Sequence, residues 1–175
     1  MAKFLAGTHG VGKSTLLKQV REIRPDYYTT DGISRPVRRF VREQHTTLTL
    51  GQEQKLINDL TLFNFDNALL HKNYISTRSI IDCIAYATVL YPDLDVEFLK
   101  KHLQEKASEI EYVFYIPIEF ELKDDGIRMT DKKEQKQIDK VIKDLLFSGI
   151  YINPEKVITI KGTPEERIEK LKQYL

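Results

Sequence analysis

Short apolar runs alternate along the chain with segments in which apolar residues recur every three or four positions. The short runs predict five strands, at residues 3–6, 27–30, 74–76, 111–116 and 157–160. The periodic segments predict helices at 13–23, 37–44, 52–70, 80–90, 96–107, 131–146 and 165–175. Strands that alternate with helices are typical of an α/β fold, so we expect a doubly wound, mostly parallel, five-stranded sheet flanked by helices.

The carboxyl ends of the predicted strands indicate where a ligand would bind. In open α/β sheets, ligands bind outside this edge of the sheet. Polar or glycine residues follow the strand ends at Ala6, Thr30, Ser76 and Ile116, where a core would not require them. These four places are therefore the candidates for chemistry.

The segment GTHGVGKST follows the first predicted strand and precedes a predicted helix. It matches G-x-x-x-x-G-K-[ST], a pattern in which glycines let backbone N–H groups turn toward phosphate oxygens. Lys13 is expected to reach the β- and γ-phosphates, and the Ser14 hydroxyl is the expected Mg²⁺ ligand. The predicted ATP-binding residues are Gly7, His9, Gly10, Val11, Gly12, Lys13, Ser14 and Thr15.

A second polar segment, TTDGISRPVRR, begins where the second strand ends. Asp31 is predicted to accept a proton from an acceptor hydroxyl or to fix that hydroxyl in place. Arg35, Arg38 and Arg39 are predicted to bind an anionic acceptor, because a guanidinium group suits phosphate geometry. The alternative is an Asp-Gly turn followed by a solvated basic helix.

The third strand delivers Thr77 and Arg78 to the same edge of the sheet. Asp82 and Tyr86 follow on one helix face, four residues apart. Arg78 is predicted to reach a phosphate, and Asp82 to orient Arg78 or the acceptor. The simpler interpretation is that Asp82 caps the helix or pairs locally, while Tyr86 packs in the core.

The segment KDDGIRMTDKKEQ follows the fourth strand. Residues 118–131 are predicted to form a lid that closes over the triphosphate and excludes water. Closure would bring Arg128 to the charge on the transferring phosphoryl group. The alternative is a surface turn with a solvated arginine. Arg128 is thus predicted to be catalytic, together with Lys13, Asp31 and Arg78.

Composition and charge add few constraints. The chain has 175 residues and a formal net charge of +1, which argues neither for nor against a nucleic-acid partner. The single cysteine, Cys83, cannot form an intrachain disulfide and fits a reducing compartment. No apolar run approaches the ~20 residues of a membrane span, so we expect a cytoplasmic protein without a membrane partner.

Five stretches of the chain, taken in order, resemble those of the AAA_28 (NadR/thymidylate-kinase-like) group of small P-loop kinases. They are GTHGVGKST, DGISR, STRSIIDCIAY, IPIEFELKDDGIRMTD and IKGTPEERIEKL. The resemblance covers nearly the whole chain and implies one P-loop NTPase domain over residues 1–175, of the nucleoside monophosphate kinase type. It also implies ATP and Mg²⁺ as cofactors, held by Gly12, Lys13 and Ser14. By the same resemblance, Arg78 faces the phosphates or the acceptor, and Arg128 belongs to the lid. Many members of the group are phage or bacterial enzymes.

One position departs from the group. Its members usually have Asp-Arg at the end of the third strand, where this chain has Thr77-Arg78. The acid at this place is a Walker-B or catalytic carboxylate. Either Asp31 or Asp82 substitutes for it, or Thr77 binds a metal-bound water.

These observations predict an enzyme that moves the γ-phosphoryl group of ATP to a nucleotide or nucleoside, with a (deoxy)nucleoside monophosphate as the leading acceptor. One alternative is a kinase that acts on a hydroxymethyl group of a modified base in phage DNA, which makes DNA a partner. Another is a nucleotide-binding regulatory ATPase with slow hydrolysis. The sequence leaves the base specificity open. It also does not decide between a monomer and a homodimer.

Overall fold

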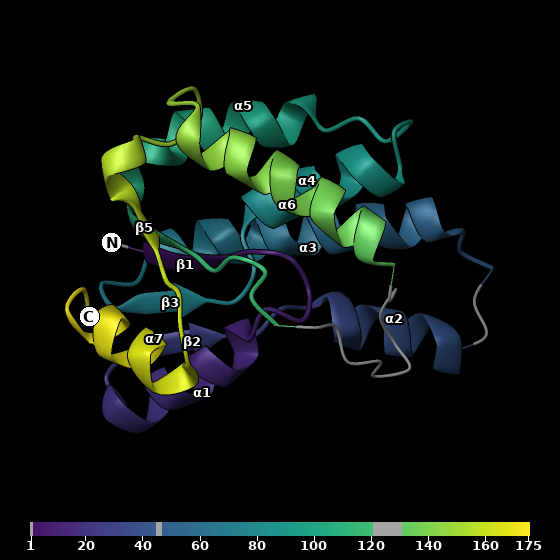
Figure 1. The fold of residues 1–175 in the computed structure, drawn as a ribbon. Coiled ribbons are helices and arrows are strands. Elements are labelled where there is room, and N and C mark those ends of the chain that lie inside the picture. The colour runs from purple at the N-terminus through teal and green to yellow at the C-terminus, as the bar shows by residue number, and fades with distance from the viewer. Residues whose placement is uncertain (1, 45–46, 121–130) are drawn as a thin grey trace.

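Five strands form one sheet in the computed structural model, which describes residues 2–44, 47–120 and 131–175. The strands are β1 (Ala2–Ala6), β2 (Tyr28–Thr30), β3 (Tyr74–Ser76), β4 (Ile110–Tyr115) and β5 (Val157–Thr159). They lie in the order β2-β3-β1-β4-β5, and every neighbouring pair is parallel. The predicted doubly wound parallel sheet is thereby confirmed (Figure 1).

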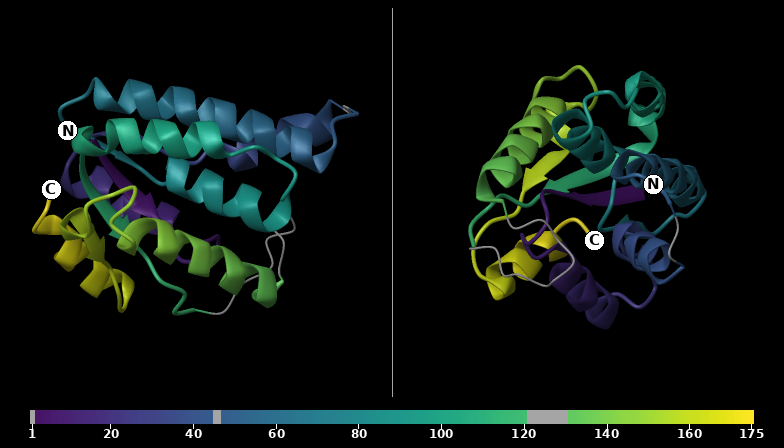
Figure 2. Two further views of the ribbon diagram at one scale, coloured as in Figure 1. Left: turned by 90° about the horizontal axis from the view of Figure 1, so that it is seen from above. Right: turned by 90° about the vertical axis from the view of Figure 1, so that its right-hand side faces the viewer.

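Helices cover both faces of the sheet. Those in the described ranges are α1 (Lys13–Ile23), α2 (Ser34–Glu43), α3 (Leu50–Leu69), α4 (Ile80–Leu90), α5 (Glu97–Lys106), α6 (Lys132–Phe147) and α7 (Pro164–Lys172), with short 3₁₀ turns at Ala107–Glu109 and Pro154–Lys156. Figures 1 and 2 show α3, α4, α5 and α6 on one side of the sheet and α1 and α7 on the other. None of these helices, as far as the structure describes them, is long and apolar enough to cross a membrane.

The alternation of side chains along the central strands separates two apolar cores. Phe4 and Val113 join the core beneath α3 to α6, whereas Leu5 and Phe114 join the core beneath α1 and α7. Successive strand residues point to opposite faces, so strands covered on both sides must be apolar at nearly every position. This requirement explains the apolar runs at β1 and β4.

Helix α4 is the most deeply buried helix on its side of the sheet. It packs against the sheet and against α3, α5 and α6, which accounts for its sequence IIDCIAYATVL. Cys83 is fully buried there as a free thiol. The helix begins beside the P-loop, so its first two turns bring side chains to the carboxyl edge of the sheet.

The observed helix ends differ from the expected ones by a few residues, for identifiable reasons. Helix α3 begins two residues early because Thr49 and Gln52 form a reciprocal capping box. Helix α2 begins at Ser34 and includes Pro36 in its first turn, where a missing N–H costs nothing. Helix α7 begins after the capping residue Thr163 and ends three residues earlier than expected.

Candidate active site

The P-loop runs from the end of β1 to the start of α1. Gly7 has φ 150°, and a Cβ there would lie 2.5 Å from the carbonyl oxygen of Ile116. Gly12 caps α1 with φ 95°, a left-handed conformation that side chains rarely adopt. The glycines of the motif are therefore required by a close backbone approach at one end and by a left-handed turn at the other.

The side chain of Lys13 folds back over the loop. Its ammonium group donates to the carbonyl oxygens of Gly7 and of Thr8, the latter at 2.7 Å. Ser14 and Thr15 are exposed in the first turn of α1. The cation and the hydroxyls thus lie at the amino-terminal end of a helix, where the backbone dipole favours a bound anion.

Asp82, on α4, holds the beginning of the P-loop in place. One carboxylate oxygen accepts the backbone N–H of Gly7 at 3.1 Å, and the other accepts the backbone N–H of Ser79 at 3.1 Å. The side chain is completely buried. Asp82 therefore caps α4 and fixes the point where β1 becomes the loop, with both of its oxygens engaged by the protein.

Tyr86 lies one helical turn after Asp82 and holds the middle of the loop. Its hydroxyl accepts the backbone N–H of His9 at 2.8 Å and lies 2.7 Å from Nδ1 of the same residue. The amide of Gln135, on α6, donates to the carbonyl oxygen of His9 at 2.9 Å. Helices α4 and α6 together fix the conformation of His9.

Arg78 lies at the end of β3, with its guanidinium group over the ring of Tyr86 at 5.1 Å from the ring centroid. Burial alone would lower the pKa of Arg78, but Cys83, Asp82 and Tyr86 outweigh this effect and raise the pKa. The side chain is therefore a cation held over Tyr86, the residue that bonds His9 of the P-loop. Contact with an aromatic face favours such a cation.

Asp31 reaches the P-loop from the end of β2. Its Oδ1 accepts a hydrogen bond from the Ser14 hydroxyl at 3.0 Å and from the Thr77 hydroxyl at 2.8 Å. The Thr77 hydroxyl in turn accepts the backbone N–H of Gly32 at 2.8 Å. The strand ends of β2 and β3 are thereby joined directly to the first turn of α1.

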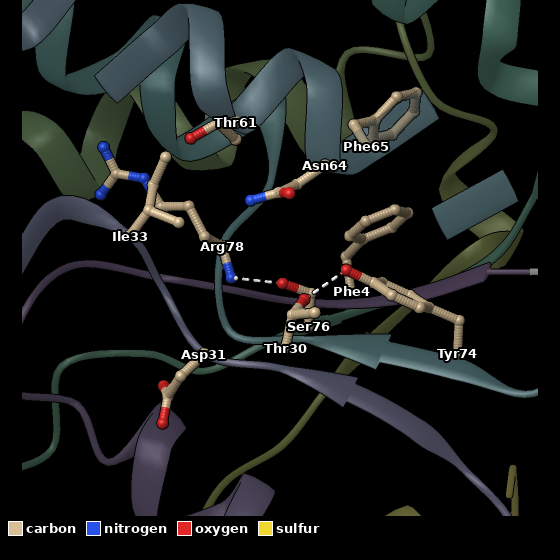
Figure 3. A pocket seen from close by; sticks show the side chains of 10 residues that line it. All are labelled: Phe4, Thr30, Asp31, Ile33, Thr61, Asn64, Phe65, Tyr74, Ser76 and Arg78. Atoms are coloured by element: carbon tan, nitrogen blue, oxygen red, sulfur yellow. Dashed lines mark hydrogen bonds between the residues drawn. The ribbon is translucent and has the colours of Figure 1, made fainter. Parts of the chain in front are cut away.

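A small polar hollow lies between the ends of β2 and β3 and helix α3 (Figure 3). Its cavity volume is about 10 Å³, on the scale of a single water molecule. Thr61 and Asn64 face it from α3, and Arg78 faces it from β3. The remaining lining residues are Phe4, Thr30, Asp31, Ile33, Phe65, Tyr74 and Ser76.

The structure brings most of the predicted site residues together. Five of them lie at the carboxyl edge of the sheet, as their positions after the predicted strand ends indicated. These are Lys13, Ser14, Asp31, Arg78 and Asp82. Arg35 and Arg38 lie on α2, which follows Asp31 directly; Arg35 is exposed and Arg38 is partly buried. Arg128 and most of the predicted lid lie outside the described residues, so that role stays a prediction.

Sequence reasoning missed a contact between α7 and the P-loop. Arg167, which is 3% exposed, donates to the carbonyl oxygen of Val11 at 2.5 Å and to the carboxylate of Glu119 at 2.7 Å. Glu119 also accepts the backbone N–H of Gly162 at 2.9 Å. An arginine near the end of the sequence thus stabilises a loop near its beginning. No local pattern signals such a pairing.

The Arg167–Glu119 pair predicts a specific pH dependence of stability. Burial would raise the pKa of Glu119, but the bonds to Arg167 and to the Gly162 N–H outweigh it and lower the pKa. A carboxyl whose pKa is lowered by folding stabilises the folded state above its ordinary pKa of about 4.3, and this stabilisation is lost as pH falls. Glu119→Gln should therefore flatten the acid-side decline in the free energy of unfolding.

Urea unfolding at several pH values between about 3 and 6 measures this decline. The matched control is Glu22→Gln, at an exposed glutamate on α1. Its profile should follow that of the wild type. A Glu119→Gln profile parallel to the wild type would show that the pair does not stabilise the fold.

The fold and the loop define a class: a parallel sheet of order 2-3-1-4-5 with a P-loop after its central strand is a P-loop kinase-like α/β fold. The chain belongs to the AAA_28 family, whose model is described as an AAA domain and matches residues 3–167. The predicted family resemblance is confirmed. No curated protein sequence matches the chain.

Solved structures with a similar fold include a deoxyadenosine kinase, a thymidylate kinase and NadR protein. Deoxyadenosine kinase from M. mycoides, solved with dCMP and dCDP as products, is 12% identical with a TM-score of 0.68, over 99% of this chain and 98% of that one. Thymidylate kinase from Candida albicans is 16% identical with a TM-score of 0.67, and the match covers 99% of this chain and 89% of that one. NadR protein in complex with NR is 15% identical with a TM-score of 0.71, and the match covers 99% of this chain and 51% of that one. Likeness at such identities establishes the shared fold.

Proposed function

We propose that this protein transfers the γ-phosphoryl group of ATP to a nucleotide or nucleoside, with a deoxynucleoside monophosphate as the leading acceptor. The observation that carries the proposal is the position of Arg78. This cation lies between a complete P-loop and a separate polar hollow at the adjacent strand ends. Two binding places joined by a fixed cation suit the transfer of a phosphoryl group from one ligand to another.

The P-loop residues have distinct roles in this reaction. The backbone N–H groups of the loop bind the phosphate oxygens of ATP, and Lys13 leaves the carbonyl oxygens of Gly7 and Thr8 to bridge the β- and γ-phosphates. Mg²⁺, when bound with ATP, neutralises charge on the phosphates. The exposed Ser14 hydroxyl and the Asp31 carboxylate are oxygen donors of the kind this ion prefers.

The polar hollow is the proposed acceptor site. Thr61 and Asn64 present a hydroxyl and an amide from α3, which suit hydrogen bonds to a base or sugar. Its cavity volume is smaller than a nucleotide, so acceptor binding there requires the lining residues to rearrange. Two similar structures support this choice of acceptor class, because one is a deoxyadenosine kinase with dCMP and dCDP bound and the other is a thymidylate kinase. Arg128 is proposed to approach the transferring phosphoryl group from the lid.

One experiment tests the proposal directly. The protein is incubated with γ-labelled ATP and a panel of nucleosides, deoxynucleoside monophosphates and DNA containing hydroxymethylated bases. Label in a deoxynucleoside monophosphate is the expected result. Label in DNA would establish the base kinase instead, and ATP binding without any labelled acceptor would favour a regulatory ATPase.

Arg78→Ala should lower kcat/KM for the phosphate acceptor about 100-fold, because a fixed cation between donor and acceptor is lost. Arg78→Lys should restore only part of the rate, since an ammonium group lacks the forked guanidinium geometry. Steady-state kinetics with the acceptor identified above measures both variants.

Arg24→Ala is the matched control, because Arg24 is paired with Asp26 at the far end of α1. Its kcat/KM should stay within about twofold of the wild type. An Arg78→Ala enzyme with the wild-type kcat/KM would contradict the role of Arg78.

A further inference from the structure

Residue 77, which follows the carboxyl end of β3, is a threonine. In P-loop NTPases, Mg²⁺ is held by the P-loop Ser or Thr together with an aspartate from a neighbouring strand end. Here β3 is one of the two strands next to the P-loop strand, and the residue after its carboxyl end is Thr77, which contacts the same Asp31 oxygen as Ser14. Its side chain is buried and carries no charge. If the site takes Mg²⁺, the carboxylate must come from elsewhere.

Of Asp31 and Asp82, the two acids that the sequence offers as substitutes, Asp31 is the exposed one. Asp82 is completely buried, and its two oxygens accept the backbone N–H groups of Gly7 and Ser79. Asp31 is exposed at the end of β2, and its Oδ1 lies against the Ser14 hydroxyl. Figure 3 shows its carboxylate turned away from Thr61 and Asn64. The group therefore faces the nucleotide side rather than the hollow.

Thr77 fixes this orientation. Its hydroxyl donates to Asp31 Oδ1 at 2.8 Å and accepts the backbone N–H of Gly32 at 2.8 Å. Its own backbone N–H donates to the carbonyl oxygen of Thr30 at 3.2 Å. With one donor and one acceptor used, the Thr77 hydroxyl holds the Asp31 side chain and the turn that follows it in one arrangement.

The spacing of the two oxygens fits the geometry of Mg²⁺. An octahedral ion with Mg–O distances near 2.05 Å has neighbouring ligand oxygens about 2.9 Å apart. Ser14 Oγ and Asp31 Oδ1 are 3.0 Å apart. Protein sites for Mg²⁺ commonly supply only one or two carboxylates and leave the other positions to phosphates and waters. No larger cluster of acidic, histidine or cysteine ligands occurs within the described ranges.

We propose that Asp31 replaces the missing carboxylate at position 77 as the Mg²⁺ ligand beside Ser14, and that Thr77 is its positioning residue. The inference rests on the proposed use of Mg²⁺–ATP. It also bears on the acceptor: an aspartate committed to the metal is not the base for a hydroxyl, which favours an acceptor that is already anionic, such as a monophosphate.

Metal binding can be measured without turnover. Mn²⁺ is titrated into the full-length protein saturated with ADP, and free Mn²⁺ is followed by electron paramagnetic resonance. Asp31→Asn should weaken Mn²⁺ binding at least tenfold while leaving ADP affinity in EDTA unchanged. Thr77→Val should weaken it about threefold, and Thr77→Ser, which keeps the hydroxyl, should match the wild type. Asp59→Asn, at an exposed aspartate on α3, is the control and should bind like the wild type.

Two outcomes would overturn the inference. One is unchanged Mn²⁺ affinity in Asp31→Asn. The other is an equal loss of ADP affinity in EDTA, which would mean that Asp31 merely holds the loop. Adding Thr77→Asp to Asp31→Asn returns a carboxylate to the usual place and should recover most of the Mn²⁺ affinity. A wild-type protein that binds neither ADP nor Mn²⁺ would contradict the proposed function itself, so the two failures are distinguishable.

Discussion

Lys13→Ala is expected to lower kcat about a thousandfold, or about 4 kcal/mol of transition-state stabilisation. The lysine is the only cation of the described loop that is placed to meet charge on the transferring phosphoryl group. Its ammonium group donates to carbonyl oxygens of the loop, and the side chain is half-buried, so the fold should persist. Steady-state kinetics and thermal unfolding of the same preparation measure the two effects.

Lys18→Ala is the matched control, because this exposed lysine lies on the same helix about one turn further from the loop. It should keep the wild-type kcat. A folded Lys13→Ala protein with unchanged kcat would mean that GTHGVGKST does not bind the triphosphate during catalysis.

Asp82→Ala is expected to cost about 2–4 kcal/mol in the free energy of unfolding and to weaken ATP binding about tenfold. Loss of a helix cap costs about 1 kcal/mol, and a buried N–H left without a partner costs about 1–3 kcal/mol more. The second effect falls on Gly7, whose N–H would lose its acceptor at the point where the P-loop begins. Urea unfolding and ATP titration measure the two losses.

Thr49→Ala separates capping from anchoring. Thr49 is the N-cap of α3, and its hydroxyl accepts the backbone N–H of Gln52 at 3.3 Å. This variant should lose about 1 kcal/mol of stability and bind ATP like the wild type. If Asp82→Ala also bound ATP normally, Asp82 would be a helix cap with no influence on the nucleotide site.

The fold followed from the sequence because its signals are local. Apolar runs at β1 and β4 and helical periodicity in α1 and α4 each depend on neighbours within a few residues, and their bounds were predicted closely. Larger errors occurred where a helix start depends on a cap, as at Thr49, or where proline enters a first turn, as at Pro36. Such ends are decided by single side chains rather than by periodicity.

The site was predictable only in part, for a related reason. The P-loop is one continuous motif, and Asp31, Arg78 and Asp82 follow strand ends that a parallel sheet must bring to one edge. The bonds among them were not visible: that Asp31 turns to Ser14, and Asp82 to Gly7, depends on orientations set by packing. The contact between Arg167 and Val11 spans most of the chain, and no spacing rule covers it.

The contact of Arg167 with the P-loop also has a consequence for cleavage of the chain ahead of α7. Arg167 lies 156 residues after Val11, whose carbonyl oxygen it holds, so a distant part of the chain supports the loop. Without α7, the loop would lack this support, and the second core, which α7 closes against Leu5 and Phe114, would be open. A proteolytic cut between β5 and Pro164 should therefore loosen the P-loop as well as the core that α7 covers.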